Sequence, residues 1–201
     1  MTRSLLHCFI ALLLATLLTA CGSGAGGASS ADNTASTLPP STSSATASAD
    51  ISLLFMGNSH TSVNNLSGMV TAMVKAGLPN KTVAGMDAPG WMHLQERSTD
   101  PATLALLKSQ RWSFVILQAQ DYSQSGLYFY PTTGAEELVR QSRAASATPI
   151  MFPEWARRGI NESQRIYDLH VSIAMKEPAC VAPIPQAFDL ALARQPALVL
   201  L

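Results

Sequence analysis

The order of apolar and polar residues after residue 50 predicts a succession of short strands and longer helices. Five short apolar runs are typical of buried strands: 51–56, 81–86, 114–118, 149–152 and 180–182. Four longer stretches carry apolar residues at helical spacing: 65–76, 99–109, 134–145 and 162–176. Strands that alternate with helices form parallel sheets covered on both faces. The pattern therefore predicts an α/β fold, a three-layer α/β/α sandwich with a mostly parallel sheet.

The first 20 residues have the order of a secretory signal. Arg3 supplies a positive start, an apolar run covers 5–20, and the small residues Thr19 and Ala20 precede Cys21. The run is shorter than the roughly 20 apolar residues that a membrane-spanning helix requires. Its end resembles the lipobox of bacterial lipoproteins, in which the cysteine is acylated. The resemblance implies a lipoprotein signal peptide over 1–20 and lipidation (palmitate) at Cys21; an ordinary signal peptide is the alternative.

Residues 21–50 are a predicted linker that follows the lipidated cysteine. They consist almost entirely of Ser, Thr, Ala, Gly and Pro and contain no aromatic residue, so they cannot bury enough apolar surface to become ordered. Residues 51–201 then make one domain. The lipid would anchor this domain to a membrane on the periplasmic or cell-surface side. Gly22 after the cysteine favours the outer membrane, by resemblance to Gram-negative lipoproteins.

Composition narrows the classes of partner and cofactor. The formal net charge is zero, only 13% of residues are charged, and no basic cluster is present, which argues against nucleic acid. The four histidines lack the paired spacing of metal ligands, so we expect no metal site. We also expect no cofactor.

Ser59 is the first residue with a plausible chemical role. The run 51–56 leads directly into Gly57, Asn58 and Ser59, and a predicted helix follows. In open parallel sheets, sites form beyond the carboxyl ends of the strands. A hydroxyl near the positive end of a helix suits nucleophilic attack, which generates negative charge. Ser is also a common helix cap, and this local pattern alone favours neither role.

The sequence Leu53-Leu-Phe-Met-Gly-Asn-Ser-His-Thr61, followed by Asn64-Asn65-Leu66, resembles the first block of the SGNH (GDSL-type) hydrolases. Its Gly-Asn-Ser-His core corresponds to a subgroup of that family. The resemblance implies a flavodoxin-like SGNH fold and assigns the role of nucleophile to Ser59.

Two further blocks of the family contribute donors that bind the oxyanion. Gly90 lies in the interval of the second block, and the resemblance implies that its N–H is such a donor; a turn glycine is the alternative. Gln120 stands where the family has an Asn after the third strand, and its amide can donate the same hydrogen bond. Gln118 is a possible substitute, and solvated loop residues are the alternative for both glutamines.

The family's last block, an Asp-x-x-His that supplies the general base, is missing. The segment 181–188 resembles the residues that precede this block, and the sequence stops at Leu201, where the block would begin. The resemblance therefore implies a C-terminally truncated member that lacks the final block and its helix. We expect activity to be impaired, because Ser59 has no Asp-x-x-His dyad to activate it.

These observations together predict an exported lipoprotein with a serine ester hydrolase domain of the esterase or acetylesterase class. The expected substrate is a small ester or an acylated carbohydrate, and the expected membrane contact is the lipid anchor. The acyl and alcohol groups and the oligomeric state stay open, as does whether Leu201 is the natural C-terminus. Two alternatives are a truncated pseudoenzyme and a non-catalytic surface lipoprotein that binds glycans through aromatic residues: Trp91, Trp155, Tyr128 and Tyr130.

Overall fold

A computed structural model describes residues 49–199 and shows a single parallel sheet covered by helices. The sheet has five strands in the order β2-β1-β3-β4-β5, and every neighbouring pair is parallel. The strands are β1 (Ile51–Met56), β2 (Val83–Asp87), β3 (Phe114–Leu117), β4 (Thr148–Met151) and β5 (Cys180–Val181). All carboxyl ends of the strands therefore lie at one edge of the sheet.

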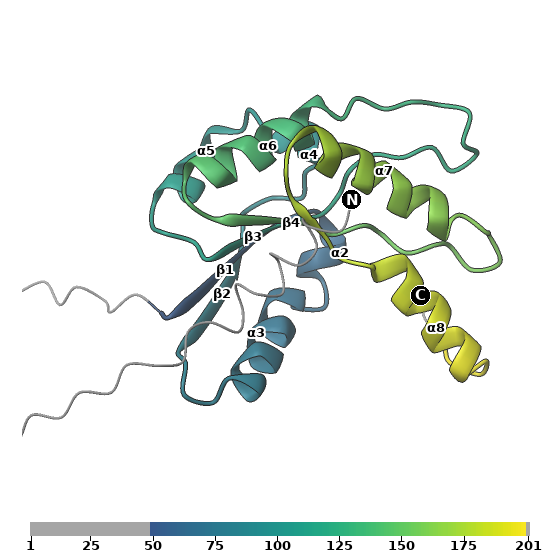
Figure 1. Cartoon of the computed structure of the whole chain (residues 1–201), viewed down its shortest axis with the longest axis horizontal. Helices are drawn as coiled ribbons and strands as arrows, with labels where there is room; N and C mark the ends of the chain where they lie inside the picture. The colour runs from purple at the N-terminus through teal and green to yellow at the C-terminus, as the bar shows by residue number, and fades with distance from the viewer. Residues whose placement is uncertain (1–48, 200–201) are drawn as a thin grey trace, which may run out of the picture. The chain divides into compact units, whose positions relative to one another are not determined.

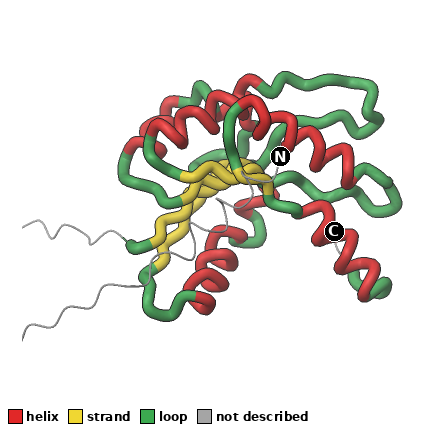
Figure 2. The backbone as a smooth tube through the Cα atoms, viewed as in Figure 1, coloured by secondary structure: helices red, strands yellow, loops and turns green. Residues whose placement is uncertain are grey.

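The helices cover both faces of the sheet (Figures 1 and 2). Before β3 the chain forms α2 (Ser59–Ser62), α3 (Leu66–Gly77), α4 (Leu94–Arg97) and α5 (Pro101–Lys108). After β3 it forms α6 (Thr133–Ala144), α7 (Ser163–Lys176) and α8 (Ile184–Arg194). Helix α3 lies on one side of the sheet, whereas α5, α6 and α7 lie on the other (Figure 1). No helix within residues 49–199 combines the length and apolar character needed to cross a bilayer.

Alternation of side chains along the strands produces two apolar cores. Leu54 and Met56 belong to a core with residues of α5, α6 and α7. Leu53 and Phe55 point to the opposite face and pack with Ile116 and the apolar stripe of α3. Both faces of β1 are thus buried, which explains why its sequence is a continuous apolar run.

The predicted fold class is confirmed, and each predicted strand and helix is present with shifts of only one or two residues at most ends. The pattern did not predict α2, α4 or α8. Helices α2 and α4 have four residues each, too few to display a helical period. Helix α8 begins between Pro183 and Pro185, and prolines in a first turn are compatible with a helix. The predictions of a signal peptide, of lipidation at Cys21 and of a linker lie outside the described residues, apart from the linker's last two positions.

Candidate active site

The turn after β1 places Ser59 at the first position of α2, beside the carboxyl edge of the sheet. The helix cap is Asn58, whose side-chain oxygen accepts a hydrogen bond from the His60 N–H at 3.0 Å. Thr61 closes the turn by donating its hydroxyl to the Asn58 carbonyl at 2.8 Å. Because Asn58 makes the capping bond, the hydroxyl of the half-buried residue Ser59 is not needed for this purpose. We call residues 57–61 the nucleophile turn.

Gly57 allows the nucleophile turn to pack closely against the end of β3. A Cβ atom at this position would lie 2.4 Å from Gln118 Oε1 and 2.6 Å from Thr61 Cγ2, closer than real Cβ atoms approach. The same Gln118 oxygen accepts the Asn58 N–H at 3.0 Å. The missing side chain at Gly57 thus makes room for a hydrogen bond that holds the next peptide in place.

Arg97 holds the nucleophile turn from another direction, and the sequence analysis missed it. Its side chain is completely buried, and its guanidinium donates to the carbonyls of Gly57, Pro89 and Gly90 and to the Thr103 hydroxyl. Burial lowers the pKa of Arg97 below its ordinary value. An arginine in a charged segment of sequence is typical of a solvated helix, so no local signal indicates this role.

Gly90 lies in the left-handed region of backbone conformation, with φ 77°, which glycine adopts without strain. The Arg97 guanidinium fixes the backbone at this point, because it donates to the Gly90 carbonyl at 2.6 Å and to the Pro89 carbonyl at 3.2 Å. Because the peptide between Pro89 and Gly90 is trans, the Gly90 N–H points opposite to the Pro89 carbonyl and away from the guanidinium. One buried side chain therefore orients both the nucleophile turn and the predicted oxyanion donor.

The two glutamines after β3 are buried rather than solvated. Gln118 is fully buried and donates its amide to Glu154 at 2.9 Å. Gln120 is 4% exposed, and its amide nitrogen donates to the carbonyls of Asp121 and Pro131 at 3.0 Å each. Between them, Ala119 has φ 79°, a strained conformation for a residue with a Cβ atom. Gln120 could bind an oxyanion only by releasing one of these two carbonyls, and its role as a donor stays a prediction.

Two histidines lie near the carboxyl edge of the sheet, and each is paired with a carboxylate. His93 Nδ1 lies 2.8 Å from Asp121 Oδ1, and His60 Nδ1 lies 3.7 Å from Glu154 Oε1. Burial raises the pKa of Glu154, while the nearby His60 and His93 partly offset that rise. Sequence reasoning missed Glu154 and both pairings, because their members come from separate loops. Within residues 49–199, no group of three or more His, Cys, Asp or Glu side chains is arranged to hold a metal ion.

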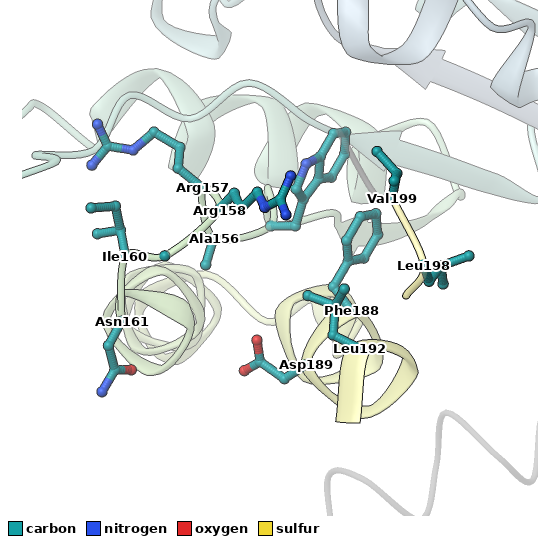
Figure 3. A pocket seen from close by; sticks show the side chains of 12 residues that line it. Ala156, Arg157, Arg158, Ile160, Asn161, Phe188, Asp189, Leu192, Leu198 and Val199 are labelled. Carbon is teal, nitrogen blue, oxygen red and sulfur yellow. The ribbon is translucent and has the colours of Figure 1, made fainter. Parts of the chain in front are cut away.

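A cavity of about 380 Å³ lies between the loop after β4 and helix α8 (Figure 3). The ring of His60 packs on Trp155 with ring centres 5.1 Å apart, and Trp155 stacks on Phe188 at 4.8 Å. Trp155 and Phe188 both line the cavity, and His60 connects them to the nucleophile turn. The remaining walls include both charged and apolar side chains, among them Arg157, Arg158, Asp189, Leu192, Leu198 and Val199.

The comparisons with known proteins bear on the fold. No protein-family model matches the chain, and no curated protein matches it in sequence. A solved structure from Slackia heliotrinireducens, provisionally assigned as an SGNH hydrolase, is 21% identical with a TM-score of 0.55. That match covers 70% of this chain and 82% of the Slackia chain. The protein described here therefore has the α/β fold seen in that structure.

A second structure is similar over a smaller share of the chain. The psychrotrophic esterase EstA from Pseudoalteromonas sp., inhibited by monoethylphosphonate, is 17% identical with a TM-score of 0.49. The match covers 66% of this chain and 76% of EstA.

Proposed function

We propose that the chain is an exported lipoprotein whose domain over 51–201 is a serine ester hydrolase of the SGNH type. The observation that carries this proposal is the position of Ser59 on a tightly held turn at the carboxyl edge of the sheet. Asn58 makes the capping bond of α2, and Gly57, Gln118 and Arg97 hold the backbone around Ser59. A nucleophile that must attack at a defined angle requires such support.

The reaction would proceed through an acyl-enzyme. The Ser59 oxygen attacks the acyl carbonyl, and the N–H groups of Ser59 and Gly90, with the Gln120 amide, stabilise the oxyanion. The alcohol then leaves, and water hydrolyses the acyl-serine. We expect a low rate from residues 51–201, because these residues contain no Asp-x-x-His block.

The cavity, which His60 and Trp155 connect to the nucleophile turn, supports a small substrate. A volume of about 380 Å³ is at the lower end of ligand pockets, which suits a small ester or one acylated sugar unit. Trp155 and Phe188 offer an apolar face for such a group. Acylation of Cys21 would hold the domain at a membrane surface on the periplasmic or cell-surface side.

Hydrolysis of p-nitrophenyl acetate by the full chain and by its Ser59→Ala variant tests the reaction class. We expect a slow rate that depends on Ser59 and an acetyl group on Ser59 detectable by mass spectrometry. Equal rates in the two proteins would contradict the proposal. Incorporation of labelled palmitate, compared with a Cys21→Ser variant, tests the lipid anchor separately.

Exposed aromatic residues favour glycan binding as a second candidate function. Trp91 is 67% exposed, Tyr128 69% and Tyr130 45%, although aromatic side chains usually lose solvent contact on folding. Trp155, by contrast, packs between His60 and Phe188. Binding of a glycan array that persists in Ser59→Ala and is lost in Trp91→Ala, without any ester hydrolysis, would favour this function.

A further inference from the structure

We propose that His93 and Asp121 form the acid–base pair that activates Ser59. The inference rests on the proposed function of Ser59 as nucleophile, and it assigns to this pair the task of the Asp-x-x-His block. His93 would exchange the proton with the reacting oxygen atoms, and Asp121 would hold the imidazole in position.

The two residues of this pair follow the two strands that flank β1. His93 lies in the segment after β2 and Asp121 in the segment after β3, and β1 lies between these two strands. Neighbouring strands are about 4.8 Å apart, so β2 and β3 are separated by roughly 10 Å. The 2.8 Å contact between the two side chains therefore joins the segments that follow the two neighbours of β1, the strand that leads into Ser59.

Backbone contacts hold the segment of His93 at the same place. The Leu94 N–H donates to the Ala119 carbonyl at 3.0 Å, which attaches the start of α4 to the end of β3. Four residues after His93, the Arg97 guanidinium binds the carbonyl of Gly57. Helix α4 is thus tied at one end to the loop of Asp121 and at the other to the nucleophile turn.

The contact between His93 and Asp121 selects the tautomer that a general base requires. An ionised carboxylate only accepts hydrogen bonds, so Nδ1 of His93 carries the hydrogen and donates it to Asp121. The other ring nitrogen, Nε2, then holds a free electron pair that can accept a proton. This division of roles between the two nitrogens is the one that serine hydrolases use. The His93 side chain is 48% exposed, so a substrate can approach it.

The other described imidazoles are less suited to this role. His60 follows Ser59 directly and packs on Trp155. Its Nδ1 lies 3.7 Å from Glu154 Oε1, which is too long for a hydrogen bond that would fix the tautomer. His170 is buried in α7, and its Nδ1 donates to the Ile166 carbonyl at 2.8 Å. Charged groups near His93 are Asp121, the more distant Glu154, and Glu96, whose carboxylate accepts the His93 N–H at 3.1 Å.

The proton balance of the reaction is complete with these groups. As the Ser59 oxygen bonds to the acyl carbon, its proton moves to His93 Nε2, and the Asp121 carboxylate stabilises the imidazolium. The imidazolium then gives the proton to the alcohol oxygen as the ester bond breaks. In the second half, water gives a proton to Nε2 and its oxygen attacks the acyl group. The same proton finally returns to Ser59 as the acid leaves.

The test measures p-nitrophenyl acetate hydrolysis by the full chain and by four variants: Ser59→Ala, His93→Ala, Asp121→Asn and, as a control, Asp168→Asn, which alters an exposed carboxylate of α7. We expect His93→Ala to lose about 100-fold or fall to the Ser59→Ala background, since general-base catalysis contributes about that factor or more. Asp121→Asn should lose about tenfold or more, and Asp168→Asn should keep at least about a third of the rate. Circular dichroism checks that each variant is folded.

Chemical rescue separates a proton-transfer role from a structural one. Imidazole added to His93→Ala should restore part of the rate, whereas a double variant that also carries Ser59→Ala supplies the background from imidazole itself. A Ser59-dependent rate that survives His93→Ala, or that imidazole fails to restore, would overturn this inference and leave the nucleophile standing. Equal rates in the original chain and Ser59→Ala would instead overturn the proposed function, and this inference with it.

Discussion

The nucleophile turn is adjacent to the cavity lined by Trp155 and Phe188, but different kinds of interaction hold the two together. The turn is surrounded by fully buried polar side chains, Arg97 and Gln118, which bind backbone groups of residues 57 and 58. The cavity is lined in part by exposed apolar side chains, with Leu192 37% and Val199 74% exposed. Hydrogen bonds in a buried network demand one geometry, whereas apolar contacts are non-directional.

This difference indicates which part of the site has a fixed geometry and which part tolerates substitution. A polar group that loses its partner inside the protein carries a large penalty, so the turn has few alternative arrangements. The apolar side chains of the cavity wall, such as Leu192 and Val199, can shift without leaving polar groups unsatisfied. We therefore expect the turn to be sensitive to substitution and the cavity to be tolerant, and substitutions in the two regions test that contrast.

Replacing Arg97 should have the largest effect. In Arg97→Met the buried carbonyls of Gly57 and Gly90 lose their donor, and each such loss costs about 1–3 kcal/mol. We expect the free energy of unfolding to fall by about 3 kcal/mol or more in urea titrations. Arg158→Met, which alters an exposed arginine of the cavity, is the matched control and should change it by less than about 0.5 kcal/mol. Similar values for the two variants would remove the contrast.

The buried His170 in α7 should make stability depend on pH. Burial lowers the pKa of His170 from 6.5 to about 4, so below pH 6.5 the unfolded chain binds a proton that the folded chain does not. The free energy of unfolding should therefore fall as the pH drops from about 6.5 to about 4, by about 3 kcal/mol from this group. Unfolding curves of His170→Leu should show a smaller dependence in that range. If the free energy of unfolding of His170→Leu depends on pH as strongly as that of the original chain, other groups cause the dependence. His60→Gln, which alters an exposed histidine, is the control.

Adding one methyl group to Gly57 should destabilise the turn. In Gly57→Ala the new Cβ atom collides with Gln118 and Thr61, and we expect a loss of about 1–3 kcal/mol. Gly77→Ala, at the end of α3, meets no atom within 4 Å and should be neutral or slightly stabilising. Thermal unfolding of the pair measures the difference, and equal melting temperatures would argue against close packing at Gly57.

Removing an aromatic ring from the cavity should have the smallest effect. Phe188→Ala deletes the ring that stacks on Trp155 at 4.8 Å, and aromatic pairs contribute about 0.5–1.5 kcal/mol. We expect a loss of about 1 kcal/mol with a shift in tryptophan fluorescence, while Leu190→Ala leaves both unchanged. A loss as large as that of Arg97→Met would show that the cavity is as tightly determined as the turn.

The sequence by itself determined the fold class and the positions of the main elements. Buried parallel strands require continuous apolar runs, and the apolar stripes of α3 and α7 have a clear helical period, so both are visible locally. The same reasoning located Ser59, because a strand that leads into Gly57 and a helix marks the carboxyl edge of a parallel sheet. Helix α8 escaped notice because its first turn contains prolines.

Only the tertiary structure decided which side chains meet around Ser59. Arg97, Gln118 and Glu154 carry no local sign of burial, since a polar residue is buried only where distant backbone groups satisfy it. The pairing of His93 with Asp121 depends on the strand order β2-β1-β3, which sets the loops after β2 and β3 on either side of β1. Strand order arises from the packing of the whole sheet, so no pattern within one segment encodes it.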